Sequence, residues 1–304
     1  MANITFAFPF DSDVGAVFTP ALSGGSWSVA LPLTNLQDRF LYNVARSSAA
    51  SLVSTTFDID LGVLKPAQLL AILPGVVGRS LPDVLGYWSR NAKARMRGSN
   101  TAGDFASPVY DTGWDDVFSV IYPQGSLYVG HPSFMDGRLS AEQAAGYRIP
   151  YISVLATLAL CRYHRVEIDD TANAAGYLDL ARLIISPGYT ALYNPSPGLN
   201  IGFDTDTTSE RSLGGVDFFD RRTGRRMLEG TIERLPEDEA FTWPFEMMRL
   251  LDKEGQLFVL VNPDDTTHLH RRSFLATLKE MTRLTWPDDD GNRLSWRFSL
   301  MEFL

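Results

Sequence analysis

The sequence is poor in residues that would cross-link it covalently or hold it in a lipid bilayer. Among 304 residues there is one cysteine, Cys161, inside an apolar run. With no second cysteine, no disulfide can form within the chain, and we expect a buried core thiol here rather than a nucleophile. No run of about 18 apolar residues occurs, so no membrane-spanning helix is expected.

Lysine is scarce, and positive charge is missing from the beginning of the chain. Of the 27 basic residues four are lysines and the remaining 23 are arginines. Arginine binds carboxylates through a planar guanidinium and is enriched at protein interfaces, although a biased genome composition would enrich it equally. The first basic residue is Arg39, so the basic start of a secretory signal is not expected.

The charge balance is negative, with 36 acidic residues and a net charge of −9. A surface that binds nucleic acid is ordinarily basic, and no nucleic-acid partner is therefore expected. Sequence motifs of catalysis are missing too: there is no Gly-x-Ser-x-Gly elbow, no P-loop and no dinucleotide fingerprint. We therefore expect a protein that is not an enzyme and that has no catalytic residue and no cofactor.

Two groups of residues could be interpreted as metal sites, and each has a plainer interpretation. His268 and His270 would share a face on a strand, but no third ligand follows at a known spacing. Asp169, Asp170 and Asn173 offer oxygen ligands for Ca²⁺ but miss the EF-hand order. A polar hairpin edge and an Asx turn are the favoured interpretations, so no metal site is predicted.

Short strands follow one another over residues 31–190. Phe57, Ile59 and Leu61 alternate with Asp58 and Asp60, which is the period of a half-buried strand. The apolar run at residues 67–75 is typical of a strand buried on both faces.

The stretch from Arg162 to Tyr189 contains two more strands around the turn sequence DDTANAAG. Val166 and Ile168 fall on one face of the first strand, and Leu178 and Leu180 on one face of the second. We expect these two strands to be adjacent and to close a β-sandwich.

Residues 1–30 are rich in phenylalanine, broken by glycine and proline, and free of positive charge. This composition predicts an extended N-terminal arm. The arm would either add to the sheet edge of a neighbouring molecule or pack along its own domain.

Proline and glycine are concentrated at residues 186–200, which predicts a domain boundary and a second, smaller β domain over residues 191–304. GGVDFFDRRTGRRMLEGTIERL is expected to form a hairpin that turns at Thr223-Gly224. The segment PEDEAFTWPFEMMRLLDKEG begins acidic and ends basic, as a helix does, and Pro244 is expected to kink or divide it.

The end of the chain predicts one more hairpin, across the turn PDDDGN. In its last strand four apolar residues alternate with Ser295, Arg297 and Ser299. The apolar set is Leu294, Trp296, Phe298 and Leu300. The expected fold class is mainly β, with a jelly-roll β-sandwich and a smaller antiparallel β-sandwich that has one flanking helix.

Six short elements occur in a fixed order over residues 30–190. They are Asn35-Leu36, Ile59 to Gly62, Arg95 to Ser99, Tyr110 to Trp114, Tyr163 to Ile168, and Gly176 to Leu178. Together they resemble the discoidin, or galactose-binding-like, jelly roll, in the version found in tail proteins of tailed bacteriophages. The paired cysteines of secreted discoidin modules are missing, which puts a transfer of their sugar or lipid site in doubt.

The C-terminal third resembles a second element of such particles. FFDRRTGRRMLEGTIERL, the helix after it and LFVLVNPD are similar to the small β-sandwich of tail-tube and distal-tail proteins. The two resemblances imply a virion structural protein of a phage tail tip or baseplate, assembled in the bacterial host cytoplasm. It would form a ring, a hexamer or a trimer, around the tube axis and link the tail tube to tip or fibre proteins.

Two charged clusters are the candidate inter-subunit contacts of such a ring, since an arginine-rich strand of one copy could face an acidic turn of the next. Each cluster could equally be a solvated hairpin tip. The candidates are Arg221, Arg222, Arg225 and Arg226 in one cluster and Asp288, Asp289 and Asp290 in the other.

An alternative function is that of a carbohydrate- or receptor-binding accessory module of the particle. Weak glycan contact would use aromatic side chains near predicted loops, namely Tyr87, Trp88, Trp114 and Tyr122. Core packing is the ordinary role of each. An enzyme acting on polysaccharide is a third and more remote hypothesis.

Overall fold

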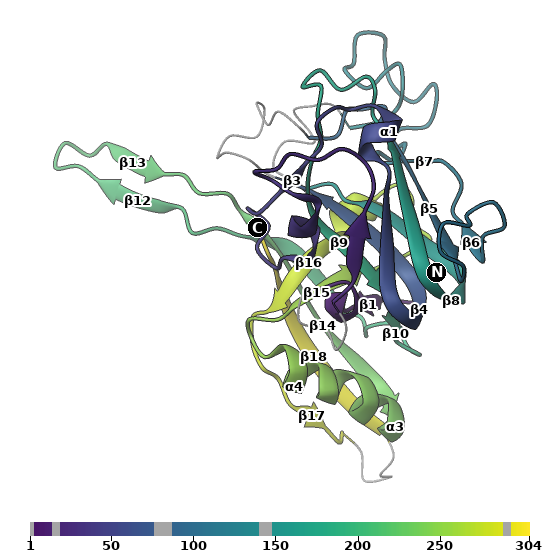
Figure 1. Ribbon diagram of the computed structural model, residues 1–304. Coiled ribbons are helices and arrows are strands. Elements are labelled where there is room, and N and C mark those ends of the chain that lie inside the picture. The colour runs from purple at the N-terminus through teal and green to yellow at the C-terminus, as the bar shows by residue number, and fades with distance from the viewer. Residues whose placement is uncertain (1–2, 14–18, 76–86, 140–147, 288–292) are drawn as a thin grey trace. The chain divides into compact units, whose positions relative to one another are not determined.

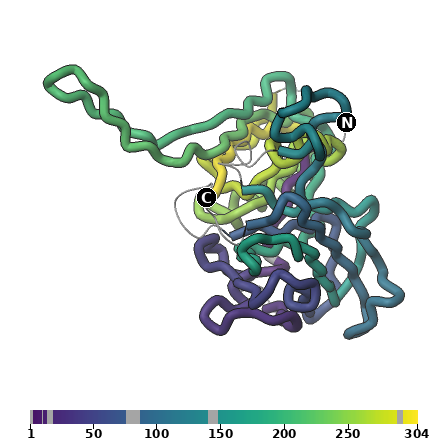
Figure 2. Tube along the Cα trace, turned by 90° about the horizontal axis from the view of Figure 1, so that it is seen from above, coloured from purple at the N-terminus to yellow at the C-terminus, as the bar shows by residue number. Residues whose placement is uncertain are grey.

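The computed structural model describes residues 3–13, 19–75, 87–139, 148–287 and 293–304 (Figures 1 and 2). The chain divides into two units. The smaller unit comprises Met1–Phe6, Tyr189–Asn262 and Arg272–Leu304, and the larger unit comprises Ala7–Gly188 and Pro263–Arg271. None of the helices in the described ranges has the length and apolar character needed to cross a membrane.

The larger unit is an antiparallel sheet in which the order is β3-β9-β4-β8-β5-β6, with β2 paired to β4 and β7 paired to β5. Its strands are β2 (Ala21–Ser23), β3 (Ala45–Arg46), β4 (Phe57–Pro74), β5 (Lys93–Ser99), β6 (Tyr110–Asp111), β7 (Asp115–Asp116), β8 (Tyr151–Asp169) and β9 (Asp179–Ser186). Its short helices are η1 (Pro9–Asp11), η2 (Leu33–Gln37) and α1 (Leu52–Thr55), and α5 (Leu269–Arg272) lies at its border.

The alternation seen in the sequence determines the faces of these strands. Phe57, Ile59 and Leu61 are buried in one core with Val166 and Ile168 of β8. The intervening Asp58 and Asp60 lie on the opposite face, where their carboxylates accept hydrogen bonds from arginines of β8. Strands β4 and β8 both contain register shifts, which let two long strands bend around the shared core. The predicted half-buried strand is confirmed.

The prediction that the two strands after Arg162 are adjacent is wrong, because β4 lies between β8 and β9. The turn between them does not close a tight hairpin. Asp170 accepts a hydrogen bond from the Ser89 backbone N–H at 3.0 Å, and the Asn173 amide donates to the Tyr87 carbonyl at 2.7 Å. These bonds hold the turn against another segment, and all eight residues of β9 are buried.

The N-terminal segment pairs within its own chain where it is described. Strand β1 (Thr5–Ala7) lies between β10 and β15 in the sheet of the smaller unit, and β2 pairs with β4 in the larger unit. The ring of Phe6 packs against Trp296 and Phe298 with centroids 5.6 and 5.7 Å apart. These residues therefore supply core and ladder contacts to their own chain.

The smaller unit is a second antiparallel sheet, with the order β10-β1-β15-β16-β18-β14-β11 and with β17 paired to β18. Its further elements are β10 (Tyr189–Thr190), β11 (Asn200–Asp204), β12 (Thr208–Arg211), β13 (Asp217–Asp220), β14 (Arg225–Pro236), α3 (Glu237–Ala240), η3 (Phe241–Phe245), α4 (Glu246–Leu251), β15 (Gln256–Leu260), β16 (Ser273–Leu278), β17 (Leu284–Thr285) and β18 (Arg293–Glu302). The chain is thus mainly β, with antiparallel sheets and one flanking helix, as predicted.

Two local predictions in this unit are confirmed by the structure. Leu294, Trp296, Phe298 and Leu300 are each no more than 1% exposed, and β17 pairs with β18 as a hairpin. The predicted helix consists of α3, a π-helical turn η3 and α4, and Pro244 lies within η3. The widened turn fits the missing proline N–H, which removes one donor from the helical ladder.

The predicted hairpin turn at Thr223-Gly224 is wrong. The hairpin is β12–β13, and its turn lies at residues 212–216, where the Ser212 N–H donates to the Val216 carbonyl at 2.8 Å. Gly215 has φ of +82° there, a conformation that costs glycine little and other residues more. Thr223-Gly224 lies between β13 and β14 instead.

Candidate functional site

The main candidate site is the ribbon formed by β12, β13 and the residues that join them to β11 and β14, here called the arm (residues 205–224). In Figures 1 and 2 the arm extends away from the sheet of its own unit. The register pairs Thr208 with Asp220 and Arg211 with Asp217. All eight residues of the two strands are exposed, so the arm contributes little to the core of its own unit.

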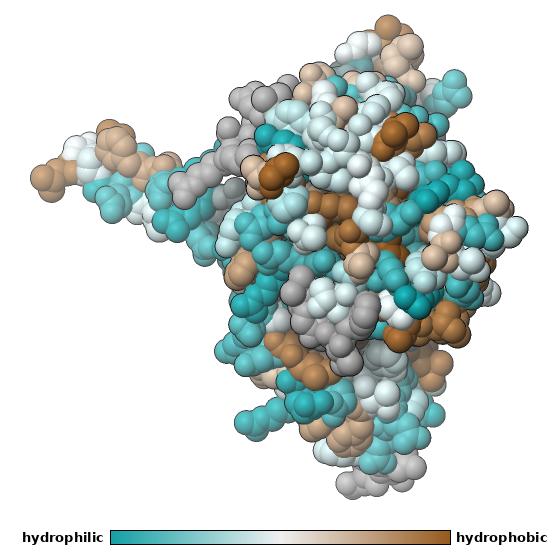
Figure 3. Space-filling model, in the orientation of Figure 1, coloured by the Kyte–Doolittle hydropathy of each residue, from teal (hydrophilic) through white to brown (hydrophobic). Residues whose placement is uncertain are grey.

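Each face of the arm presents one phenylalanine. Phe218 lies opposite Glu210 on one face, and Phe219 lies opposite Ser209 on the other. The side chains are 62% and 69% exposed, and Leu213 at the turn is fully exposed. Figure 3 shows apolar side chains along the arm among hydrophilic ones.

Such a ribbon is unfavourable as an isolated structure. A two-stranded hairpin is marginally stable at best in water, and each face of this one exposes a phenylalanine ring to solvent. Covering both faces would remove two phenylalanine rings from water. The arm is therefore chemically suited to protein association.

The structure separates the four arginines that the sequence placed in one inter-subunit cluster. Arg226 is 2% exposed. Its guanidinium pairs with the Glu302 carboxylate, with Nε at 2.9 Å from Oε2, and Nη1 donates to the Ser273 carbonyl at 3.2 Å. Arg226 is thus a buried structural residue, and the prediction of an inter-subunit contact is wrong for this position.

The other three arginines of that cluster lie near the base of the arm. Nη2 of Arg222 lies 3.4 Å from Oδ2 of Asp220, and Nη2 of Arg225 lies 3.9 Å from Oδ2 of Asp206. The Arg221 side chain is exposed. The loose geometry leaves these guanidinium groups accessible to a partner. Asp288, Asp289 and Asp290 lie outside the described residues.

An apolar groove lies beside β11, at the end of the sheet order. Four apolar side chains form it, from Leu199, Ile201, Leu228 and Val261, and its volume is about 310 Å³. Pro195, Asn194, Asn262 and Arg272 complete the lining. This set of eight residues is called the edge groove below. All five residues of β11 are exposed, so the groove opens beside an accessible strand edge.

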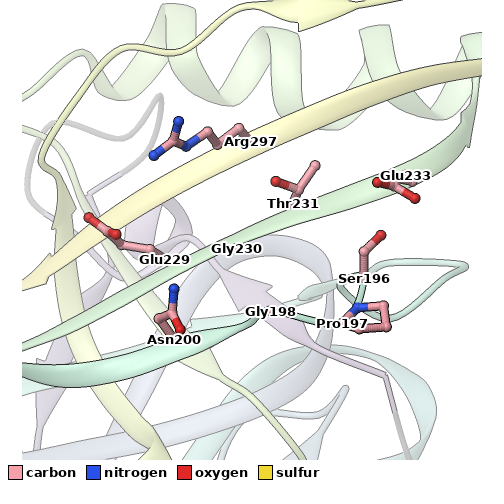
Figure 4. Close-up of a pocket in the computed structure, with 9 residues that line it drawn as sticks. All are labelled: Ser196, Pro197, Gly198, Asn200, Glu229, Gly230, Thr231, Glu233 and Arg297. Atoms are coloured by element: carbon pink, nitrogen blue, oxygen red, sulfur yellow. The ribbon is translucent and has the colours of Figure 1, made fainter. Parts of the chain in front are cut away.

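The other face of the same strands carries a polar pocket of about 250 Å³ (Figure 4). Glu229 and Glu233 of β14 and Arg297 of β18 line it, together with the loop before β11. The Ser299 hydroxyl donates to Glu229 at 3.1 Å. A Cβ at Gly230 would lie 2.7 Å from a methyl of Leu199, so glycine is needed for this close packing. The pocket offers charged groups for polar contacts with a partner.

The larger unit has a loop pocket of about 690 Å³, lined by residues from 120 to 137. Tyr122 and Phe134 line it with the exposed Met135. The Ser133 hydroxyl is fully buried and has no hydrogen-bond partner among the described residues. Asp136 at its edge pairs with Arg90 at 2.6 Å. Aromatic rings, a hydroxyl and a carboxylate are groups that polyhydroxylated ligands use.

The aromatic residues proposed from the sequence for glycan contact have different surroundings. Trp88 is buried and donates its indole N–H to the Ile149 carbonyl at 3.1 Å, and the Tyr87 hydroxyl accepts from the Ile149 N–H at 2.8 Å. Trp114 is 41% exposed, and Tyr122 lines the loop pocket. Packing explains the first two, whereas the last two remain accessible to a ligand.

The two groups considered as metal ligands have other roles. His270 is buried in α5 rather than on a strand, and its Nε2 lies 3.4 Å from the Ser119 hydroxyl. Burial raises the pKa of Asp170, whose carboxylate takes part in the turn described above. In the described ranges, no three His, Cys, Asp or Glu side chains gather as a possible metal site.

No protein-family model matches the sequence, and no curated protein does. Among solved structures, a family 32 carbohydrate-binding module from Clostridium perfringens in complex with galactose has 12% identity and a TM-score of 0.35, covering 60% of this chain and 98% of that chain. The lectin domain of lectinolysin complexed with Lewis B antigen has 15% identity and a TM-score of 0.35, over 54% and 90%. A Streptococcus pneumoniae fucose-binding module has 10% identity and a TM-score of 0.34, over 58% and 94%.

Sequence reasoning missed the arm as a site, although a signal was present. Phe218 and Phe219 are consecutive, so on a strand they must lie on opposite faces. Charged residues surround them at Asp217, Asp220 and Arg221. Two adjacent aromatics in a charged, glycine-flanked hairpin cannot both enter a single core, which points to an exposed ribbon.

Proposed function

We propose that this chain is a structural subunit that associates with copies of itself through the smaller unit. The observation that carries the proposal is the arm, in which two phenylalanine rings on opposite faces of one ribbon are exposed. Burial of a phenylalanine side chain contributes about 1.5–3 kcal/mol, so self-association would relieve an unfavourable exposure that the monomer cannot relieve. Stable interfaces bury about 1,200–2,000 Å², which an extended arm can approach without a large flat surface.

The particle that fits best is the tail tip or baseplate of a tailed phage. The support is the resemblance of the C-terminal third to tail-tube and distal-tail proteins, together with an arm suited to a repeated contact. In such a particle the subunits form a closed ring and also bind neighbouring tail proteins. The chain would then be located in the virion tail.

The test is the molar mass of the purified chain by analytical ultracentrifugation over a range of concentrations. The wild type is expected to form a discrete oligomer. A variant with both Phe218→Ser and Phe219→Ser is expected to be monomeric, because the arm faces become polar. Val129→Ser is the matched control, since Val129 is 83% exposed but lies in the larger unit. A wild type that stays monomeric at every concentration refutes self-association.

A second candidate function is glycan binding in the larger unit, favoured by the loop pocket. Its unpartnered Ser133 hydroxyl and the rings of Tyr122 and Phe134 match the way in which sugar hydroxyls and ring faces are bound.

Saturation-transfer NMR with galactose, fucose and N-acetylglucosamine tests this second candidate. At least one sugar is expected to give a signal that Phe134→Ala abolishes. Tyr42→Ala serves as the control, because Tyr42 is 70% exposed and outside the pocket. No signal from the wild type, or an equal loss in both variants, contradicts the pocket as a glycan site.

A further inference from the structure

We propose that the edge groove of one copy receives the arm of a second copy, with Phe218 as the inserted side chain. This inference rests on the proposed self-association and names the two surfaces that meet. The groove has an apolar floor formed by Leu199, Ile201 and Leu228. Phe218 is the large apolar side chain on one face of the arm.

The groove cannot be filled by the arm of its own chain. Strand β11 enters the arm at Asp204, and β14 leaves it at Arg225, so the arm prolongs these two strands. Phe218 is seven residues before Arg225, roughly 20 Å farther along the ribbon at the rise of a strand. The groove lies on the opposite side of that junction, beside Ile201 and Leu228. Figures 1 and 2 show the arm extended away from the rest of the sheet of its unit.

The charges of the two surfaces are complementary. The face of the arm that carries Phe218 also carries Glu210 and Asp220, because directly paired residues and residues two apart share a face. Among the described residues, the lining of the groove contains Arg272 and no carboxylate. Both faces have an arginine beside an aspartate, Arg222 at 3.4 Å from Asp220 on the Phe218 face and Arg211 at 3.7 Å from Asp217 on the other. The faces differ at the residue paired with the ring, which is Glu210 for Phe218 and the uncharged Ser209 for Phe219. The face that carries Glu210 is therefore the one that fits a groove with a guanidinium at its side.

The strand edge beside the groove adds a second kind of contact. Strand β11 stands at the end of the sheet order, so the backbone groups on its outer side face away from β14. An extended segment of a second molecule can pair with such an edge. A docked arm would then combine a backbone ladder with one buried ring.

The arm and the groove are different surfaces of one chain, so the contact is head-to-tail. Heterologous contacts of this kind generate rings when the rotation closes and filaments when it does not. Each copy would donate one arm and receive one. The Phe219 face of the arm remains available for a further contact within the same assembly.

Mixing two complementary variants tests this pairing. Phe218→Ser removes the donor surface and keeps the groove, and Ile201→Arg blocks the groove and keeps the arm. Both positions are exposed, and circular dichroism with thermal unfolding verifies that each variant is folded. Each variant alone is expected to be monomeric, whereas an equimolar mixture is expected to form a one-to-one heterodimer by analytical ultracentrifugation.

Three further variants make the result specific. Ile201→Val keeps the apolar floor and is expected to oligomerise like the wild type. Variants with one added cysteine each, Thr208→Cys on the Phe218 face of the arm and Asn262→Cys in the groove lining, keep Phe218 and Ile201. Mixed and oxidised, they are expected to form a disulfide between copies. Burial raises the pKa of the native Cys161 thiol to about 11, which keeps that thiol out of the reaction.

The outcomes separate this inference from the function on which it depends. A wild type that oligomerises while the complementary mixture stays monomeric, or while the two cysteines do not cross-link, overturns the arm-to-groove pairing and leaves self-association standing. A wild type that is monomeric overturns both. A complex that Ile201→Arg leaves intact would show that the arm binds elsewhere.

Discussion

The arginines of the larger unit and those of the arm show how different the same residue type can be in two regions. In the larger unit, Arg162 and Arg165 of β8 bind Asp60 and Asp58 through two nitrogens each, at 2.6–2.9 Å. On the arm, Arg211 and Arg222 lie 3.7 and 3.4 Å from their nearest carboxylates and are mostly exposed. Two short hydrogen bonds orient each guanidinium in the larger unit, whereas the guanidinium groups on the arm are exposed to solvent.

The abundance of arginine alone therefore does not identify a protein interface. Strand pairs in the larger unit use arginine to neutralise aspartates of the neighbouring strand, which explains much of the enrichment without any partner. Exposed aromatic side chains are the better sign of association, because water penalises them and a salt bridge at the surface is worth little.

The largest effect on stability is expected at Arg226, the buried arginine of the predicted inter-subunit cluster. Arg226→Ala should lower the free energy of unfolding of the smaller unit by about 3–5 kcal/mol, since it leaves the Glu302 carboxylate buried without its partner. Arg222→Ala is the matched control, within about 0.5 kcal/mol of the wild type. Denaturant titration, with hydrogen exchange of β14 and β18, measures both. Equal losses of unfolding free energy in the two variants would contradict the structural role of Arg226.

A pH effect of the next size is expected in the core of the larger unit. His164 is fully buried, and desolvation lowers its pKa to about 4 from the usual 6.5. Between pH 6.5 and 4 the unfolded chain binds more protons than the folded chain, so stability falls as the pH falls through this window. The loss should reach about 3 kcal/mol.

His164→Phe isolates this contribution. The difference in unfolding free energy between the variant and the wild type should change with pH only below about 6.5. The variant also loses the contact of Nδ1 with the Tyr110 hydroxyl, 2.7 Å away, which lowers stability at every pH alike. A pH-independent difference would show that folding leaves the pKa of this histidine at its unfolded value.

A smaller effect is expected for a half-exposed pair in the larger unit. Arg165→Ala removes the bond to Asp58 and the stacking of the guanidinium on Phe105, whose ring centre is 4.3 Å away. The loss should be about 1 kcal/mol, because solvent screens the pair. Arg211→Ala on the arm, with its longer contact, should have no measurable effect on unfolding. An equal loss of unfolding free energy for Arg211→Ala would contradict the difference between the arginines of the larger unit and those of the arm.

The smallest effect on folding is expected at the arm aromatics. Phe218→Ser and Phe219→Ser remove exposed side chains that contribute little to the core of their own unit, so the free energy of unfolding of the monomer should stay within about 0.5 kcal/mol. Measuring dilute samples by fluorescence keeps association out of the result. A large destabilisation would show that the arm packs on its own chain.

Alternation along single strands could be predicted from the sequence because it depends on local periodicity. The buried sets Phe57, Ile59 and Leu61 of β4, and Leu294 to Leu300 of β18, follow from side chains that alternate between two faces. The helix around Pro244 and the last hairpin follow from similarly local signals. The sequence offers two glycine-containing turns here, with Gly215 and Gly224 nine residues apart, and only the strand register shows that the turn lies at residues 212–216.

The sequence by itself determined which face is buried in the alternating stretches of β4 and β18, because that depends only on the period of apolar residues. Tertiary structure alone decided that β4 separates β8 from β9 and that Arg226 is buried against Glu302. These outcomes depend on contacts between residues far apart in the chain, such as the 76 positions between Arg226 and Glu302. No local pattern specifies which distant segment will supply the partner.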